Sequence, residues 1–321
     1  MNVPREQPLV TVTTCVYNAG QYLREAVLSI VNQTYPNLEI LIVDDGSTDG
    51  CMESIADLRD PRIRIIRQEN RGKPAAMNVA LNAMRGDYYA LQDADDLSHP
   101  RRIEILSECM ESNRDLAAVY SGHELLIGER RVAPTFRAKD REMCRDDIAR
   151  LRMPAHDPTA MYRVGMVGHL RYSEQLLLGE GYDYMLRVGE QWPMMVVGEC
   201  LYSYRIHDTS ITRSDPERRT RLVLEAHRRA FERRGIPYTP PPIPTDGATA
   251  HRDDDNNLAA QFIESVLDQR DAGRRMAAVM TGLQCSRLHS TDPHYYKALA
   301  YALMPRRVAG WVRQRKVSHA K

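Results

Sequence analysis

Three aspartates fall within four residues of this chain, at Asp93, Asp95 and Asp96, directly after an apolar run. Carboxylates this close repel one another unless a cation neutralises them, and oxygen ligands suit a hard divalent ion such as Mg²⁺ or Mn²⁺. A hard ion in a loop after a strand suggests a substrate that carries phosphates. The alternative is an acidic turn that caps the helix beginning at Pro100, and this loop alone leaves both interpretations open.

Polar residues also follow two earlier predicted strands. A run rich in β-branched residues, 9–16, ends just before Tyr17, and a second apolar run, 38–43, ends at Asp44 and Asp45. Ligands of a parallel sheet gather at the carboxyl ends of its strands. We therefore expect three loops that are distant in sequence to meet in one crevice.

The elements that must position these loops alternate in type along residues 1–125. Strands are predicted over 9–16, 38–43, 62–67, 87–91 and 117–120, and helices over 23–31, about 52–58, 73–85 and from Pro100 onward. This alternation predicts an α/β fold with a mainly parallel sheet flanked by helices on both faces. Residues 126–215 are less regular, apart from a strand at 194–204, and 216–234 predicts a charged helix.

Composition narrows the function classes. The chain has 321 residues and a formal net charge of +1, so overall charge argues against a nucleic-acid partner. The six cysteines have no close pairs, which argues against a zinc or small disulfide scaffold and favours a reducing compartment. No run approaches the roughly 20 apolar residues of a membrane span, and the N-terminus lacks an apolar signal core. We expect a cytoplasmic protein, with peripheral contact at the inner face of the cell membrane left open.

A proline-rich stretch at 237–249 predicts a stiff extended linker. It separates a main domain, 1–236, from a helical C-terminal extension, 250–321. Within the extension, 300–316 is apolar and basic and carries Trp311. Such a segment is typical of a helix that lies on an anionic membrane surface, and the alternative is a helix packed on the preceding domain.

Several motifs in a fixed order make the chain resemble the family 2 glycosyltransferases. They lie at 12–18, 33–36, 43–49, 70–78 and 93–96, within a resemblance that covers about residues 8–210. The resemblance implies a GT-A fold and an inverting transfer of a hexosyl or N-acetylhexosaminyl group from a UDP-sugar to an acceptor hydroxyl. It further implies a saccharide or lipid-linked saccharide acceptor, in bacterial polysaccharide, lipopolysaccharide or glycolipid synthesis.

The resemblance assigns the donor to residues at these strand ends. Tyr17 would stack on the base, and Asp45 would accept a hydrogen bond from the uracil N–H. Gly72 and Lys73 would approach the phosphates, because glycine lets backbone come close and lysine supplies positive charge. Cys15 replaces a common threonine or proline at a position that often contacts the nucleotide through its backbone. The structural alternatives are a tyrosine that caps its strand and an ordinary turn into a helix.

In the acidic cluster, Asp95 matches the metal ligand of the family and Asp93 its contact to the ribose or sugar. Asp96 would act through water or cap the next helix. His207 ends a Tyr-Arg-x-His motif, and in relatives that histidine lies near the metal and the diphosphate. The expected cofactor is Mn²⁺ or Mg²⁺, which would neutralise the pyrophosphate leaving group.

The pattern departs from the family at the general base. An inverting transfer needs a base to take the proton of the acceptor hydroxyl, and the aspartate expected for this role falls on Gly181. Glu180 is the favoured substitute, because it is adjacent and one methylene longer. Asp183 is the second candidate, although on a helix it points about 200° away from position 181. Another group such as Asp157, or a catalytically impaired nucleotide-sugar-binding protein, remains as the alternative.

Overall fold

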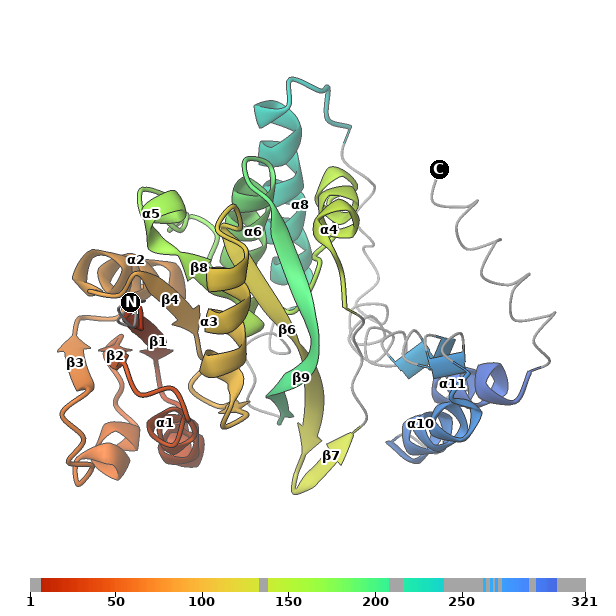
Figure 1. Cartoon of the computed structure of the whole chain (residues 1–321), viewed down its shortest axis with the longest axis horizontal. Coiled ribbons are helices and arrows are strands. Elements are labelled where there is room, and N and C mark those ends of the chain that lie inside the picture. Colours follow the sequence, from red (N-terminus) through yellow and green to blue (C-terminus); the bar gives the residue numbers. More distant parts are fainter. Residues whose placement is uncertain are drawn as a thin grey trace, which may run out of the picture. The chain divides into compact units, whose positions relative to one another are not determined.

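The computed structural model describes residues 7–132, 138–207, 216–239, 262–263, 266–267, 269–270, 273–288 and 293–304. The chain forms two compact units (Figure 1). The first comprises Met1–Gly128 and Arg137–Ile243, and the second comprises Glu129–Phe136 and Pro244–Lys321. Within the described ranges, no helix is long and apolar enough to cross a membrane.

A mixed sheet forms the centre of the first unit, with strand order β3-β2-β1-β4-β8-β6-β9-β5. The strands are β1 (Val10–Val16), β2 (Leu38–Asp44), β3 (Ile63–Arg67), β4 (Tyr88–Leu91), β5 (Leu97–Ser98), β6 (Ala118–Ile127), β8 (Met161–Arg163) and β9 (Met194–Ile206). Parallel pairing joins β1 to β2 and β4, β2 to β3, and β6 to β9. The pairs β4–β8, β6–β8 and β5–β9 are antiparallel. The predicted α/β class with a mainly parallel sheet is thus confirmed.

The register of β1 and β2 brings their ends level. Val10 pairs with Leu38 and Val16 pairs with Asp44, and the whole of β2 is buried, as in a parallel strand covered on both faces. Beyond the last pair, the Asp45 N–H donates to the Val16 carbonyl at 2.8 Å. The loops that follow these two strands therefore leave the same edge of the sheet together.

Helices cover both faces of the sheet. They are α1 (Leu23–Val31), α2 (Lys73–Ala83), α3 (Arg102–Ser112), α4 (Arg141–Ala149), α5 (Val164–Val167), α6 (Glu180–Gly189) and α8 (Pro216–Arg233), with short 3₁₀ helices η1 (Gly20–Tyr22), η2 (Cys51–Ile55) and η3 (Asp157–Thr159). One core cluster joins α1 and α3 to the sheet, and another joins α2, α6 and α8 to it. Figure 1 shows α1 and α2 on opposite sides of β1. Tyr88 and Tyr89 are consecutive on β4 and enter different clusters, because strand side chains alternate between faces.

Residues 126–215 contain more structure than the sequence pattern indicates. Helix α4 was not expected, although Asp140 caps it by accepting from the Met143 N–H at 2.9 Å, a cap that sequence can suggest. The fifth predicted strand, 117–120, continues to Ile127, through a shift of register near Gly122. The predicted helix at about 52–58 is only the 3₁₀ turn η2.

The second unit is described in separate pieces. It contains β7 (Arg130–Val132) and the helices α10 (Arg275–Leu288) and α11 (Pro293–Leu303). The two helices approach closely at Gly282, where an added Cβ would lie 2.7 Å from the Leu299 Cα. Phe262 and Val266, which are spaced four residues apart, are fully buried. Most of the predicted linker, 240–249, and most of the basic segment, 305–316 with Trp311, lie outside the described residues.

Candidate active site

The loops after β1 and β2 are tied together by hydrogen bonds. The Asn18 N–H donates to Ser47 Oγ at 3.1 Å, and the Asn18 side chain accepts from the Thr48 N–H at 2.8 Å. Asp44 Oδ1 accepts from the Ser47 N–H at 2.9 Å, so Asp44 holds the turn. Tyr17 extends from these loops with 46% of its surface exposed, so its ring is accessible to a ligand.

Asp45 organises the next loop. Its Oδ1 accepts from Gln68 Nε2 at 2.6 Å and from the Arg71 N–H at 2.9 Å, and its Oδ2 accepts from the Gly72 N–H at 2.8 Å. A carboxylate has about four acceptor positions, so one remains for a ligand donor. Gly72 has φ +89°, and an added Cβ would lie 2.7 Å from Leu177 Cδ2, so only glycine suits this position.

Lys73 begins α2 and places its ammonium among carboxylates. Its Nζ lies 2.6 Å from Asp93 Oδ1. Burial alone would lower the pKa of Lys73, but Asp93, Glu180 and Asp157 outweigh it and raise that pKa well above its ordinary value. Lys73 therefore carries its positive charge throughout the physiological pH range, at the point where the resemblance places a phosphate.

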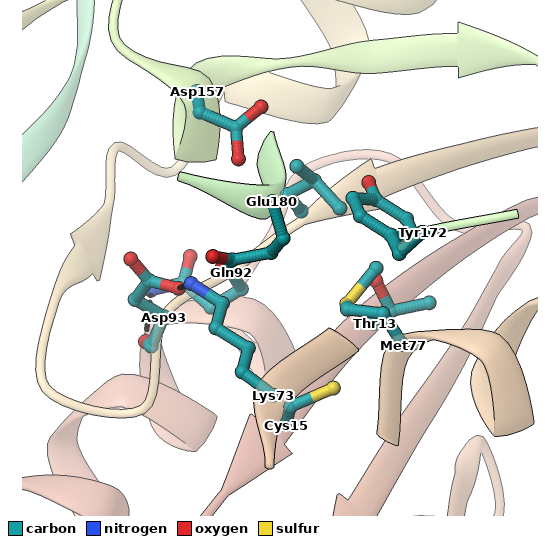
Figure 2. A pocket seen from close by; sticks show the side chains of 10 residues that line it. Thr13, Cys15, Lys73, Met77, Gln92, Asp93, Asp157, Tyr172 and Glu180 are labelled. Atoms are coloured by element: carbon teal, nitrogen blue, oxygen red, sulfur yellow. Dashed lines mark hydrogen bonds and ion pairs between the residues drawn. The ribbon is translucent and has the colours of Figure 1, made fainter. Parts of the chain in front are cut away.

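A small cleft brings several of the predicted residues together (Figure 2). It is lined by Thr13, Cys15, Lys73, Met77, Leu91, Gln92, Asp93, Asp157, Tyr172 and Glu180. Burial raises the pKa of the Cys15 thiol to about 12, against the opposing charge of Lys73, so this side chain is a neutral thiol. Tyr17, Asp45, Gly72, Asp95 and His207 do not line this cleft; they lie in the loops that adjoin it.

The acidic loop joins the end of β9 through its last two aspartates. Asp95 Oδ2 lies 2.9 Å from His207 Nε2. Asp96 is fully buried and its Oδ1 accepts from the Arg205 N–H at 2.7 Å, whereas its Oδ2 has no partner in the described part of the chain. Burial, with the neighbouring Asp95 and Asp93, raises the pKa of Asp96. Asp95 and His207 are more than a hundred residues apart in the sequence but adjacent in the structure.

A divalent ion fits the pair Asp95–His207. Two neighbouring ligands of an octahedral ion with bonds of about 2.1 Å are about 3.0 Å apart, close to the observed separation of 2.9 Å. Among the described residues, no three His, Cys, Asp or Glu side chains converge into a full set of ligands. Two protein ligands are nevertheless what Mg²⁺ and related ions commonly use when phosphates and water complete the coordination.

Arg205 is a site residue to which sequence reasoning gave no role. Its Nε donates to the Asp95 carbonyl at 2.8 Å, and its Nη2 lies 2.6 Å from Glu25. Its guanidinium also lies over the Tyr22 ring, 4.8 Å from the centroid. The sequence feature that could have pointed to Arg205 is its position in the Tyr-Arg-x-His motif. Arg205 fixes the acidic loop against the end of β9.

Arg102 is a second residue that the sequence did not reveal. It is fully buried on α3, and its Nη2 donates to the carbonyls of Leu91 and Pro158, each at 2.7 Å. Burial lowers the pKa of Arg102 to about 10, while Tyr202, Asp93 and Asp96 oppose that change. Arg102 thus connects the end of β4 to η3, and no pattern in an amphipathic helix distinguishes such an arginine from an exposed one.

The candidate bases separate in the structure. Glu180 begins α6 and lines the cleft, and burial raises its pKa while Lys73 opposes the shift. Asp183 forms ion pairs instead, at 2.9 Å with Arg187 and 3.2 Å with Arg233, and is not among the residues that line the cleft. Asp183 is therefore engaged by arginines outside the cleft, and the helical spacing predicted only that it points away from position 181.

Comparisons with known proteins identify the family of this chain. The model of the family described as Glycosyl transferase family 2 matches residues 11–170. An uncharacterized glycosyltransferase of Methanocaldococcus jannaschii is 30% identical over 210 residues, which cover 63% of this chain and 72% of that protein. The chain belongs to glycosyltransferase family 2. Other curated relatives are matched over between 16% and 66% of their own length, so the chain spans less than two thirds of most of them.

Solved structures share the fold. Staphylococcus aureus TarS 1–349, in complex with UDP-GlcNAc, has a TM-score of 0.59 at 17% identity and covers 95% of this chain and 92% of its own. The mannosyltransferase PcManGT of Pyrobaculum calidifontis, in complex with GDP-Man and Mn²⁺, has a TM-score of 0.56 at 18% identity, covering 94% and 86%. The GT-A fold implied by the sequence motifs is thereby confirmed.

Proposed function

We propose that this protein is a metal-dependent, inverting glycosyltransferase that moves a sugar from a UDP-sugar to an acceptor hydroxyl. The observation that carries the proposal is the meeting of three strand-end loops with Lys73 and the pair Asp95–His207 at one edge of the sheet. Ligands of α/β sheets bind at this edge. The complexes of TarS with UDP-GlcNAc and of PcManGT with GDP-Man and Mn²⁺ support the same class of donor.

The nucleotide is assigned to Tyr17 and Asp45. The exposed phenol ring offers a stacking surface, worth about 1–3 kcal/mol per base. Asp45 has one acceptor position left after its three loop hydrogen bonds. Uracil presents a single ring N–H, whereas guanine presents an N–H together with an amino group and would need two acceptors. The geometry of Asp45 therefore favours UDP over GDP.

The diphosphate is assigned to Lys73 and to an ion held by Asp95 and His207. When bound, Mn²⁺ or Mg²⁺ supplies positive charge to the leaving pyrophosphate. Lys73 remains protonated and adds a second positive charge, and Asp93, which pairs with it, faces the donor from the opposite loop. Gly72 lets the backbone before α2 approach the phosphates closely, because it carries no Cβ.

The acceptor is a saccharide or a lipid-linked saccharide, and the reaction belongs to polysaccharide or glycolipid synthesis. Residues 1–236 would form the catalytic domain, 237–249 a linker, and 250–321 an extension that contacts anionic membrane through 300–316. A second function, a nucleotide-sugar-binding protein with impaired catalysis, is favoured by one observation, the glycine at the expected base position, Gly181.

The donor assignment is tested by calorimetric titration of the full chain with UDP, GDP and CDP, in Mn²⁺ and in EDTA. We expect UDP to bind most tightly, and EDTA or Asp95→Ala to remove the Mn²⁺-dependent part of the affinity. Tyr17→Ala should weaken UDP binding about 5- to 150-fold, which corresponds to one lost stacking contact. Asp115→Asn is the control, because Asp115 pairs with Arg141 on the surface. Equal affinity for UDP and CDP, or no effect of EDTA, would contradict the assignment.

UDP release from UDP-GlcNAc then separates an enzyme from a binding protein. An enzyme releases UDP faster than the buffer does, in the presence of an extract that contains acceptors or with water as acceptor. Tight UDP binding without any release would favour the binding protein.

A further inference from the structure

The space next to Gly181 is filled by a side chain from elsewhere in the chain. A Cβ added at position 181 would lie 2.5 Å from the Asp157 Cγ, and closer still to its Oδ2. Real Cβ atoms do not approach other atoms so closely, because the repulsion is prohibitive. The position from which the family aspartate would project is therefore already occupied by a carboxylate, that of Asp157.

Asp157 reaches this place from η3, the short turn before β8. It lines the cleft together with Lys73, Asp93 and Glu180, and Figure 2 shows its carboxylate pointing toward these residues. Its Oδ1 is buried and has no hydrogen-bond partner among the residues that the structure describes. A buried acceptor without a donor is unusual and costly, so it marks a place where a donor from a ligand is expected.

We propose that Asp157 is the catalytic base of this enzyme, and that it supplies from η3 the carboxylate that the family carries at position 181 on α6. The inference rests on the proposed glycosyl transfer. The acceptor hydroxyl donates its proton to the Asp157 carboxylate while its oxygen bonds to the anomeric carbon of the sugar. The bond from that carbon to the diphosphate oxygen breaks, UDP leaves with the bonding electron pair, and Asp157 later returns the proton to water.

The turn that carries Asp157 is held rigidly. Arg102 Nη2 donates to the carbonyl of the next residue, Pro158, at 2.7 Å, and Thr159 closes the turn by donating from its N–H and Oγ1 to the His156 carbonyl, at 3.0 and 2.7 Å. A base held by its backbone keeps its distance to the acceptor without a cost in entropy at each turnover. Arg102 is thus a positioning residue for Asp157.

Glu180 is less suited to the same role. Backbone N–H groups of Glu180 and Gly179 stabilise the Glu180 carboxylate at the N-terminus of α6, which makes it a weaker proton acceptor. Lys73 stabilises the charge of both carboxylates and does not distinguish them. By contrast, Asp157 Oδ1 lacks any such donor in the described residues. Glu180 therefore acts on the electrostatics of the cleft, whereas Asp157 is available to accept a proton.

The acidity of Asp157 suits a base that works near neutral pH. Burial raises the pKa of Asp157 to about 7, the carboxylates Glu180 and Asp93 add to the rise, and Lys73 and the Tyr162 hydroxyl oppose it. The ionisable groups that act on it or feel its charge come from every neighbouring element: Lys73 (α2), Asp93 (after β4), Tyr120 (β6), Tyr162 (β8), Tyr172 (before α6), and Glu180 and Tyr184 (α6).

The test uses the full chain with UDP-GlcNAc and Mn²⁺, and measures donor affinity by calorimetry and UDP release across pH 5–9. Asp157→Asn should bind UDP-GlcNAc within about threefold of the wild type and lose about 10²- to 10⁴-fold in UDP release. The exchange variant Asp157→Gly/Gly181→Asp should recover at least about tenfold over Asp157→Asn, because it returns the carboxylate to the same space. Glu180→Gln, the comparison variant, should keep an acidic limb but move it to lower pH, because the negative charge of Glu180 helps to raise the pKa of Asp157.

The outcomes separate the two proposals. If Asp157→Asn releases UDP at the wild-type rate and with the wild-type pH profile, the base assignment is overturned while the transferase function stands. If the wild type itself releases no UDP above buffer, the proposed function fails, and the base assignment with it. If Asp157→Asn does not fold, the folded exchange variant decides: release well above buffer supports the assignment, and background release overturns it.

Discussion

Replacing Gly181 by alanine tests directly whether Asp157 fills the space beside it. The alanine Cβ would lie 2.5 Å from the Asp157 Cγ, and the backbone of η3 is held by Arg102, so the Asp157 side chain must leave its position. Overpacking of this kind costs about 1–3 kcal/mol of unfolding free energy. Against this, alanine gains up to about 1 kcal/mol over glycine in a helix. We expect Gly181→Ala alone to destabilise the protein by about 1–2 kcal/mol.

The same substitution in an Asp157→Ala background should have the opposite sign. With the carboxylate gone, the alanine Cβ has room, and only the helical gain of up to about 1 kcal/mol remains. The helical gain is the same in both backgrounds, so the coupling between the two positions equals the overpacking cost of about 1–3 kcal/mol, measured by denaturant unfolding of the wild type, both single variants and the double variant. For a domain of this size it corresponds to a difference in melting temperature of about 2–12 °C.

Gly165→Ala provides the matched control, because Gly165 also lies in a helix, α5, and an added Cβ there meets nothing within 4 Å. It should be neutral or slightly stabilising in both backgrounds. The reasoning is refuted if Gly181→Ala is as harmless as Gly165→Ala in the wild-type background, since Asp157 would then not occupy the neighbouring space. A coupling near zero with both single variants destabilised would refute it equally.

Three further predictions concern pH, the phosphate loop and the membrane. Because the folded pKa of Asp157, about 7, lies above the value near 4 of an unfolded aspartate, the unfolding free energy should rise as pH falls from about 7 to 4, and this slope should shrink in Asp157→Asn unfolding curves; an unchanged slope contradicts the burial of this charge. Gly72→Ala should weaken UDP binding in calorimetry and lower the melting temperature, because its Cβ meets Leu177. Gly128→Ala, also at positive φ but in open space, should lower only the melting temperature. Equal UDP affinity in both variants would contradict the assignment of the Gly72 loop to the phosphates. Anionic liposomes should sediment the full chain more than a version that ends near residue 300, and equal recovery would exclude membrane contact through 300–316.

Much of the candidate site follows from strand ends alone. Cys15, Lys73, Asp93 and Glu180 are predicted from the sequence, and all four line the same cleft. For Cys15 and Asp93 the reason is that β1 and β4 pair directly in parallel, so their carboxyl ends lie together whatever their separation along the chain. Residues within such loops can be predicted because backbone topology, rather than side-chain packing, brings them together.

The sequence did not predict which side chains pair with one another inside the site. Asp183 has the right chemistry for a base, but two arginines neutralise it, one of them on the distant helix α8. Arg102 reads as a polar residue of an amphipathic helix, yet it is fully buried and anchors η3. In both cases the outcome depends on which partners the folded chain supplies, and a single sequence carries no record of those partners.

The sequence by itself determined the α/β class and the family and supplied candidate residues for the donor, because motif order and hydrophobic periodicity depend on local chain properties. It also showed that the usual base position holds a glycine, Gly181. Only the tertiary structure decided what that glycine means. Excluded volume acts between atoms that are near in space, and Asp157 comes near Gly181 only after η3 and α6 have packed together. In the sequence, Gly181 suggests that the base has been lost. In the fold, its lack of a side chain leaves room for the Asp157 carboxylate.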